Sequence, residues 1–240
     1  MNTKYVVVFI VILTSVVAVV LSGLREVTKE QAKLNEAIFN KRAVLAAVDD
    51  YLGEGVTSKS LTDAEVLELF DSKITQKIIG PDATTSVESS KYPLAENIDM
   101  AKERKVAPAD RVYPLYIYEN DGQQFYIVSV YGKGLWDAIW GNIALKSDLN
   151  TIAGVSFDHK GETPGLGAEI KDNPAFGAEF KGKTLFDGSD FVSVAVVKGE
   201  GKGMHEVDGI SGATVTSVGV SDMIDEGMQP YLPYLENLKN

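Results

Sequence analysis

Ten residues near the end of the chain, Asp208–Ser217 (DGISGATVTS), concentrate groups that could hold or bond a ligand. The stretch carries four hydroxyl side chains, at Ser211, Thr214, Thr216 and Ser217, with two glycines and one acid. Glycines leave room for a ligand, and a helix start favours an anion because its first N–H groups lack partners. The stretch therefore fits either an ordinary helix start, which any of the hydroxyls is competent to cap, or a phosphate site.

A hydroxyl presented on the Gly-Ala turn, such as that of Thr214, could also be a covalent anchor. No histidine or lysine adjoins it in the sequence to act as a base. A separate enzyme would therefore have to form the bond. We expect the N–H groups of Thr216 and Ser217 to stabilise the phosphate charge.

Two glycine-rich stretches are further candidates. Tyr131–Asp137 (YGKGLWD) is either a hairpin turn with a core tryptophan, or a turn whose glycines let the backbone approach a flat ligand beside Trp136. His159–Gly167 (HKGETPGLG) cannot be a regular strand or helix interior, because Pro164 and its glycines interrupt both.

The second of these stretches is either a structured turn or a rigid ligand loop. In a ligand loop, Glu162 and the Thr163 hydroxyl would meet the polar edge of a heterocycle, and Leu166 would cover its face.

Composition excludes several classes of function. The net charge of −11 disfavours nucleic acid as a partner. The absence of cysteine excludes disulfides, thiolate metal sites and cysteine-ligated iron–sulfur clusters. Two histidines, His159 and His205, leave little material for a Ser-His-Asp hydrolase or a multi-histidine metal site. No G-x-G-x-x-G follows a predicted strand, so an NADH site is not indicated. We assign no catalytic acid or base and no metal ligand.

The N-terminus predicts a membrane anchor. Tyr5–Leu21 is uncharged and apolar, and its extension to Leu24 reaches about 20 residues, the length that spans a bilayer. A cleaved signal peptide is the alternative, but no clear A-x-A site follows the apolar run. We expect an uncleaved, single-pass anchor in a bacterial inner membrane, with the following domain on the periplasmic side.

The rest of the chain predicts an α+β domain on a mainly antiparallel sheet flanked by helices. We expect the anchor at residues 1–24, a helical stalk and N-terminal helices at 25–80, and the ligand-binding domain at 81–240. One helix should cover Arg25–Asp50, and a second should start at the capping box Thr62–Glu65, with Leu67, Phe70, Ile74 and Ile78 as its apolar face.

The polar stretch Gly80–Arg104 predicts a loop or a poorly ordered excursion. The predicted strands are Val112–Tyr118 and Gln124–Tyr131, which form a hairpin around Glu119–Gly122, followed by Leu135–Leu145, Ile152–His159 and Phe191–Val197. The last helix should begin near Val215.

These motifs together resemble the C subunit of the sodium-translocating NADH:quinone oxidoreductase, a family with a covalent FMN-binding domain. The resemblance rests on the anchor followed by Gly23–Glu26 (GLRE), on Gly134–Trp136 (GLW), on Gly161–Gly167 (GETPGLG) and on DGISGATVTS. It implies FMN joined through its phosphate to Thr214 by a separate flavin transferase that uses FAD. The transferase would recognise Asp208, Gly209, Ser211, Gly212, Ala213 and Thr214.

The resemblance also implies the residues around the flavin and the role of the chain. The cofactor-binding residues would be Trp136, Glu162, Thr163, Gly165, Leu166, Gly167, Ser211, Gly212, Ala213 and Thr216. The chain would relay electrons through FMN within a sodium-pumping NADH:quinone reductase, with other subunits as partners. The alternatives are the G subunit of the Rnf complex, a stand-alone FMN-binding electron carrier, and a non-redox anchored domain that binds a ligand or protein.

Overall fold

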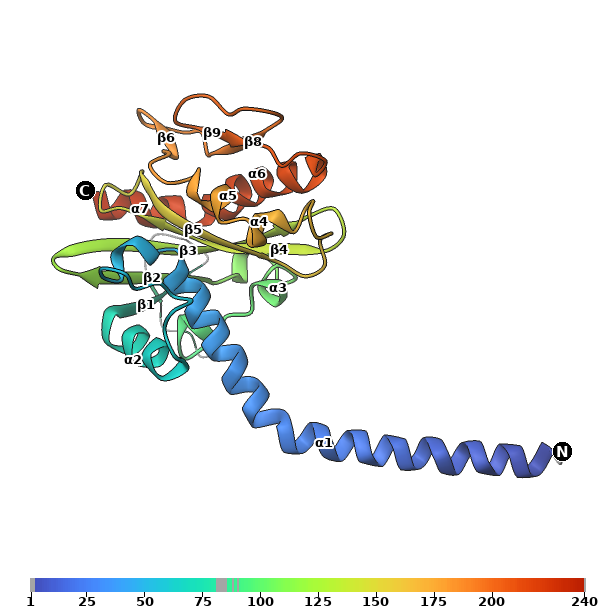
Figure 1. Ribbon diagram of the computed structural model, residues 1–240. Coiled ribbons are helices and arrows are strands. Elements are labelled where there is room, and N and C mark those ends of the chain that lie inside the picture. Colours follow the sequence, from blue (N-terminus) through green and yellow to red (C-terminus); the bar gives the residue numbers. More distant parts are fainter. Residues whose placement is uncertain (1–2, 81–85, 88, 90, 240) are drawn as a thin grey trace. The chain divides into compact units, whose positions relative to one another are not determined.

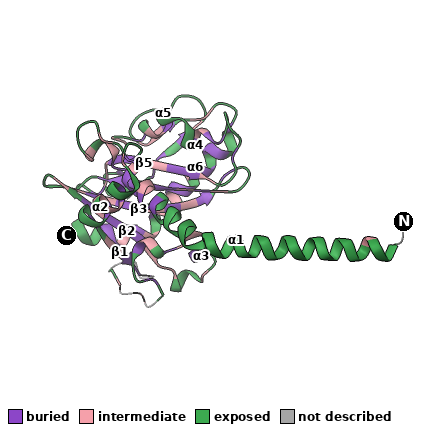
Figure 2. Ribbon diagram, turned by 60° about the horizontal axis from the view of Figure 1, so that its bottom comes forward, coloured by how far each residue is buried: buried purple, intermediate pink, exposed green. Residues whose placement is uncertain are grey.

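The computed structural model describes residues 3–80, 86–87, 89 and 91–239. The chain divides into two compact units, the first ending at Phe39 and the second starting at Asn40. The first unit is part of a single long helix, α1 (Thr3–Ala46), which is exposed along most of its length (Figure 2). Among the described residues, α1 is the one helix long and apolar enough to cross a membrane, by length and composition. The predicted stalk helix is thus continuous with the apolar segment, and it ends at Ala46 rather than at Asp50.

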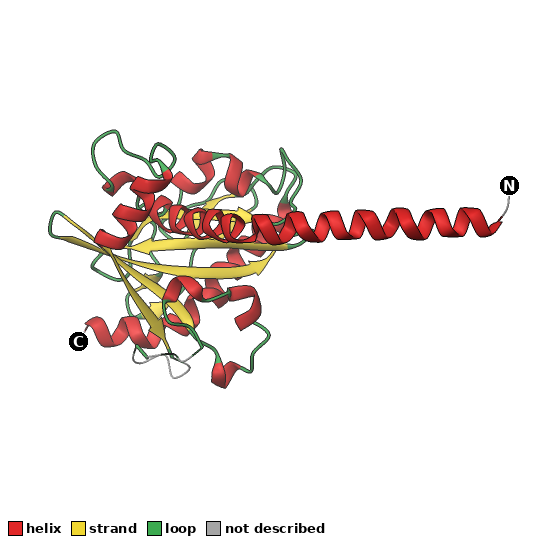
Figure 3. Cartoon of the chain, turned by 90° about the horizontal axis from the view of Figure 1, so that it is seen from below, coloured by secondary structure: helices red, strands yellow, loops and turns green. Residues whose placement is uncertain are grey.

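The second unit is built on a five-stranded antiparallel sheet, as predicted, in the order β1-β2-β3-β4-β5 (Figure 3). The strands are β1 (Ile74–Ile79), β2 (Tyr113–Asn120), β3 (Gln123–Lys133), β4 (Ala138–Leu145) and β5 (Ile152–His159).

The predicted hairpin is confirmed. β2 and β3 are joined by Asp121 and Gly122, whose φ angles of 49° and 75° match the two-residue turn that fits strand twist. The strand predicted from Leu135 begins only at Ala138, because the glycine-containing GLW segment forms a turn first.

The helix α2 (Asp63–Lys73) starts at the predicted capping box, in which Thr62 and Glu65 bond each other's backbone N–H groups. Its predicted apolar face was wrong at Ile74 and Ile78, which lie in strand β1. A spacing of four residues places side chains on one face in a helix and also in a strand, so the pattern fits both. The β-branched residues of β1 pair instead with β2.

The prediction of a loop at Gly80–Arg104 needs correction in the described part. It contains the turns η2 (Ala95–Asn97) and α3 (Met100–Glu103), and η3 (Pro108–Asp110) follows. The buried carboxylate of Glu103 accepts hydrogen bonds from the Tyr92 hydroxyl at 2.6 Å and from the Val112 N–H at 3.2 Å, which ties the segment to the domain. Positions 81–85, 88 and 90 lie outside the described residues.

The predicted strand Phe191–Val197 is also wrong in part. Its residues divide between β7 (Asp190–Phe191), which pairs antiparallel with β6 (Phe186–Asp187), and β8 (Ala195–Val197), which pairs parallel with β9 (Glu206–Asp208). Ser193 separates them with a left-handed φ of 63°, a conformation that interrupts a strand. The remaining short elements are η1 (Asp49–Tyr51), α4 (Glu169–Asp172), α5 (Pro174–Ala178) and η4 (Gln229–Tyr231).

Helices cover both faces of the sheet. The last helices, α6 (Thr214–Met228) and α7 (Leu232–Lys239), pack on one face, and α2 lies on the other (Figure 1). Successive side chains of β2 point to opposite faces of the sheet. Leu115 belongs to the core with α6, whereas the Tyr116 ring packs against Phe70 of α2 at a centroid distance of 5.9 Å.

Glycines allow α6 to approach strand β3 closely. A Cβ atom at Gly219 would lie 2.3 Å from the carbonyl oxygen of Lys133, and one at Gly132 would lie 2.6 Å from the Met223 Cβ. These contacts bring the first turns of α6 against the end of β3, where the GLW segment begins.

We expect Gly219→Ala to lower the free energy of unfolding by about 2 kcal/mol or more, because the added methyl group meets a rigid backbone carbonyl. Chemical denaturation of the full chain in detergent measures the change. Gly161→Ala is the control, since nothing lies within 4 Å of a Cβ there, and it should stay within about 0.5 kcal/mol of the unchanged chain. Equal stabilities of the two variants would contradict the close packing.

Candidate functional site

The DGISGATVTS stretch forms the turn that leads from β9 into α6. The helix begins at Thr214, within one residue of the predicted start. Its N-cap is Ala213, and no side chain caps it, so the expectation that a hydroxyl of this stretch caps the helix was wrong. The first N–H groups of the helix therefore stay available for an external acceptor. The N–H of Ser217 is an exception, because it donates to the Ala213 carbonyl at 2.9 Å, which contradicts its predicted role toward a phosphate.

The four hydroxyl groups of the stretch divide into two kinds. Thr216 and Ser217 are buried, and both hydroxyls are engaged: that of Thr216 donates to Glu162 and that of Ser217 accepts from the N–H of Ile210 at 3.2 Å. Ser211 and Thr214 are exposed, and within the described residues their hydroxyls have no hydrogen-bond partner. Tertiary structure thus leaves two of the four hydroxyls free to react.

The carboxylate of Glu162 connects the three motifs. It is 5% exposed, and its Oε2 accepts a hydrogen bond of 2.6 Å from the Thr216 hydroxyl. Its Oε1 accepts a hydrogen bond of 2.9 Å from the backbone N–H of Trp136. The Glu162 N–H itself donates to Nδ1 of His159 at 3.1 Å, which closes the loop that carries it.

Two glycines form a narrow slot for this carboxylate. A Cβ atom at Gly134 would lie 2.6 Å from Oε1, and one at Gly167 would lie 2.3 Å from Oε2 and 2.6 Å from the Thr216 Oγ1. Any side chain at either position would displace the carboxylate. The glycines of the GLW and GETPGLG motifs are therefore explained in part by the space that Glu162 requires.

The environment of Glu162 favours its charged form. Burial raises the pKa of this carboxyl, but the hydrogen bonds from Thr216 and from the backbone of the GLW segment together outweigh burial. The net pKa of Glu162 therefore lies below its ordinary value, and the group is an anion at neutral pH.

Exposed apolar side chains surround the start of α6. The indole of Trp136 is 67% exposed, and its Nε1–H donates to the Thr163 hydroxyl at 3.0 Å, which fixes the ring against the GETPGLG loop. Leu166 packs against the turn between β9 and α6: a Cβ atom at Gly212 would lie 2.8 Å from its Cδ2. Gly165 and Gly212 both adopt left-handed φ angles, 73° and 78°, which side chains disfavour. Further exposed apolar side chains on these segments are those of Leu135, Val215 and Val218.

The stretch begins at Asp208, the last residue of β9, and neighbouring segments hold this end in place. The N–H of Asp208 donates to Glu179 Oε2 at 2.7 Å, and its own carboxylate accepts from the Gly201 N–H at 2.8 Å. Gly209 allows close packing, because a Cβ there would lie 2.3 Å from the Val197 carbonyl oxygen. The turn between β9 and α6 is thus a fixed platform rather than a free loop.

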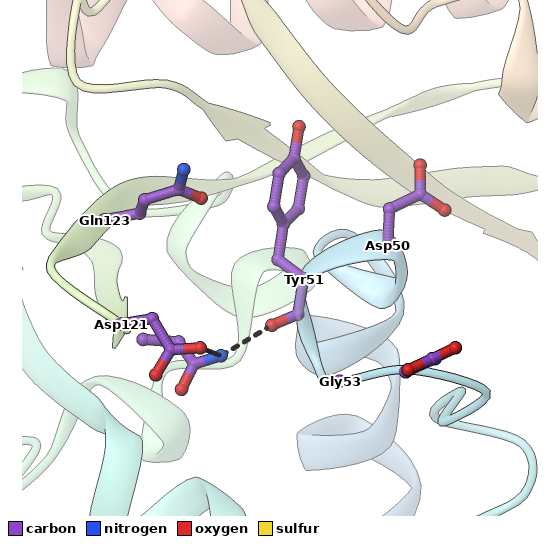
Figure 4. Close-up of a pocket in the computed structure, with 7 residues that line it drawn as sticks. Asp50, Tyr51, Gly53, Asp121 and Gln123 are labelled. Atoms are coloured by element: carbon purple, nitrogen blue, oxygen red, sulfur yellow. Dashed lines mark hydrogen bonds between the residues drawn. The ribbon is translucent and has the colours of Figure 1, made fainter.

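A hollow of about 270 Å³ lies at the end of β3 away from the GLW segment (Figure 4). Its lining residues are Asp50, Tyr51, Gly53, Glu54, Asn120, Asp121 and Gln123. β3 has 11 residues, so the two ends are separated by about 33 Å of strand. Three carboxylates line this hollow, and Asp50 pairs with Lys181 at 2.6 Å, so the hollow does not suit a phosphate.

No metal centre is formed by the described residues, in which no group of three or more His, Asp or Glu side chains could hold an ion. His205 bonds the carbonyl oxygen of Thr184 at 2.7 Å, and His159 accepts the Glu162 N–H. Both histidines thus have structural partners.

The sheet fold, the GLW segment, the GETPGLG loop and the β9–α6 turn together define the class of the domain. Residues 134–229 match the family model described as the FMN-binding domain. This range starts at the GLW segment and includes the GETPGLG loop, the β9–α6 turn and α6.

Curated relatives identify the family more closely. The chain is 34% identical to the C subunit of the Na(+)-translocating NADH-quinone reductase of Pseudomonas aeruginosa, over 92% of this chain and 90% of that protein. It is 32% identical to the corresponding C subunit of Vibrio anguillarum, over 97% of this chain and 94% of that one. The chain therefore belongs to the C-subunit family of the Na(+)-translocating NADH-quinone reductase.

Solved structures agree with this assignment. The crystal structure of the C subunit of this reductase from Parabacteroides distasonis superposes with a TM-score of 0.74 and 35% identity, covering 86% of this chain and 96% of that one. The crystal structure of Shewanella oneidensis NqrC gives a TM-score of 0.69 and 29% identity, covering 87% of this chain and 99% of that one.

The sequence predicts Glu162 at the edge of a ligand, but it indicates neither the hydrogen bonds of its carboxylate within the protein nor the role of Gly134 in making room for it. The sequence contains a signal for neither contact, because Glu162 and Thr216 are 54 residues apart.

We expect Glu162→Gln to lower the free energy of unfolding at pH 7 by about 2 kcal/mol, since a neutral amide cannot replace a charged acceptor of two hydrogen bonds. The folded-state pKa of Glu162 lies below the ordinary value of 4.5, so its carboxylate stabilises the fold above pH 4.5 and this contribution is lost as the pH falls through the lowered value. The difference between the two proteins should therefore be complete at pH 7 and shrink below pH 4.5.

Denaturation of the full chain in detergent at pH 7 and at about pH 3.5 measures this difference. Glu54→Gln, at an exposed carboxylate outside the site, is the control. A difference for Glu162→Gln that is the same at both pH values would contradict the ionised, hydrogen-bonded carboxylate.

Proposed function

We propose that this chain holds FMN covalently through a phosphodiester to Thr214 and relays electrons within a sodium-translocating NADH:quinone reductase. The observation that carries the proposal is the position of Thr214, an exposed hydroxyl without a partner in the described residues, on the uncapped first turn of α6. Membership of the C-subunit family and the FMN-binding domain match support it.

The residues at this turn fit both ends of FMN. The open N–H groups at the start of α6 suit a phosphate, and the first turn of the helix contains no acidic residue to repel it. The exposed faces of Trp136 and Leu166 offer apolar surface for a flat ring, and the glycines of the two loops leave the backbone accessible. The remaining residues assigned to the flavin are Thr163, Gly165, Gly167, Ser211, Gly212, Ala213 and Thr216.

Attachment needs an external enzyme. The bond would form between the Thr214 oxygen and the FMN phosphorus of FAD, the phosphoanhydride would break, and AMP would leave. Within the described residues, no side chain contacts the Thr214 hydroxyl to remove its proton, so the base belongs to a flavin transferase. The transferase would read the exposed positions of the stretch from Asp208 to Thr214.

FMN, when attached, supplies the electron transfer, and the chain supplies position and electrostatics. Attachment prevents loss of the cofactor and leaves a phosphate charge of about −1. The fixed platform around Gly209 and Glu162 holds the attachment point, and the exposed side chains of Trp136 and Leu166 would shield a bound ring from water.

We propose that residues 1–24 anchor the chain in a bacterial inner membrane and that residues 25–80 supply the stalk, the first helices and, through β1, one strand of the sheet. Residues 81–240 would complete the FMN domain, on the periplasmic side. The apolar part of α1 supports the anchor by length and composition. Proteolysis of spheroplasts tests the orientation: external protease should degrade the domain in intact spheroplasts. Cleavage only after the membrane is broken would place the domain in the cytoplasm.

An Rnf-type G subunit or a stand-alone FMN-binding carrier would use the same Thr214 chemistry with other partners. The full-length similarity to C subunits of the reductase favours the reductase. Co-purification of the tagged chain with the remaining subunits, together with sodium-dependent quinone reduction, discriminates between these functions.

We expect Thr214→Ala to abolish covalent flavin, because the oxygen that forms the bond is removed. The measurement is flavin fluorescence of the chain after denaturing electrophoresis, from cells that contain the transferase, with peptide mapping of the added mass. Thr214→Ser, which keeps a hydroxyl, should retain some attachment. Fluorescence that persists in Thr214→Ala, or added mass on Ser211, would contradict the assignment of Thr214.

A further inference from the structure

The first turn of α6 is held by a side chain from outside the helix. Its N-cap residue, Ala213, has no side-chain group that could bond the helix start. The Thr216 hydroxyl instead donates at 2.6 Å to Glu162, which lies 54 positions earlier in the chain. The first turn is therefore fixed to the GETPGLG loop, in addition to the local contact in which the Ser217 hydroxyl accepts the Ile210 N–H.

Helix geometry links the direction of the Thr216 side chain to that of Thr214. Residues two positions apart in an α-helix lie about 200° apart around its axis, on nearly opposite sides. Thr216 is 1% exposed and points into the protein, whereas Thr214 is exposed. The hydrogen bond that holds Thr216 inward therefore holds the Thr214 hydroxyl outward.

The Glu162 carboxylate is itself held by contacts on several sides. The Trp136 N–H binds its other oxygen at 2.9 Å, and the backbone at Gly134 and Gly167 confines it on both sides. A confined anion with two donors holds one position, so it transmits that position to the helix. The same group also joins the Trp136 segment to the attachment turn.

We propose that Glu162 is a positioning residue for flavin attachment, whose carboxylate locks the first turn of α6 through Thr216 and so presents the Thr214 hydroxyl to an FMN-donating enzyme. This inference rests on the proposed function. It assigns Glu162 a task that precedes the presence of flavin, and that task can be tested on the chain before FMN is attached.

The test compares Thr216→Val, which removes the donor at nearly constant volume, with Thr216→Ser, which keeps it. The full chain is prepared in detergent from cells without the transferase. Hydrogen exchange of the backbone amides of Ser217 and Val218, the first in α6 that donate within the helix, should be about tenfold faster or more in Thr216→Val, and close to the unchanged rate in Thr216→Ser. Amides of β3 and β4 should exchange at unchanged rates in both variants, which shows that the domain is folded.

The second readout is the rate of FMN attachment when the purified transferase, FAD and magnesium are added. Thr216→Val and Glu162→Gln should reduce the maximal rate about tenfold or more with little change in KM for the chain, because residues 208–214 are unaltered. Thr216→Ser should restore most of the rate. Equal rates in Thr216→Val and the unchanged chain, a change in KM alone, or no rescue by serine would overturn the positioning role.

Failure of the proposed function gives a different result. If the unchanged chain accepts no FMN, covalent attachment itself is refuted, while the exchange rates of the FMN-free variants still report whether Glu162 holds the turn. If the unchanged chain accepts FMN and exchange at Ser217 and Val218 is the same in all variants, the proposed function stands and the inference about Glu162 is refuted.

Discussion

The hydrogen bonds of one buried carboxylate determine the arrangement of the site. Glu162 accepts from Thr216 on α6 and from Trp136 in the turn before β4, and it lies between Gly134 and Gly167. A buried anion without such donors would be strongly destabilising, so its partners must be present together. The three motifs of the site are thereby constrained to one relative position.

The close packing of α6 on β3 supplies the second constraint. Gly132 of β3 leaves room for the side chain of Met223, and Gly219 of α6 leaves room for the backbone carbonyl of Lys133. Because packed interiors change little in volume, the helix start cannot shift without displacing the end of β3. The GLW segment continues directly from that strand end, so the sheet and the carboxylate position the same turn.

The start of α6 differs in its local charge from the acidic chain as a whole. With a net charge of −11, the surface as a whole disfavours anions. The start of α6 departs from this trend, since its first turn has no acidic side chain and its N-terminus is uncapped. The polar hollow near Asp50 follows the general trend instead, with three carboxylates in its lining. The open N–H groups of the helix and the absence of acidic residues from its first turn thus distinguish the start of α6 from the hollow, whereas the net charge is common to both.

The apolar helix, the Asp121–Gly122 hairpin, the capping box of α2 and the start of α6 follow from the amino-acid sequence alone, because each depends on neighbours within about ten residues. The sequence could not separate helix from strand at Ile74 and Ile78, where a spacing of four fits both. It also could not choose among the four hydroxyls by their chemistry, since all are alike. That Thr216 and Ser217 are buried while Thr214 is exposed follows from tertiary packing, because the contact that holds Thr216 inward joins it to Glu162, 54 positions earlier in the chain.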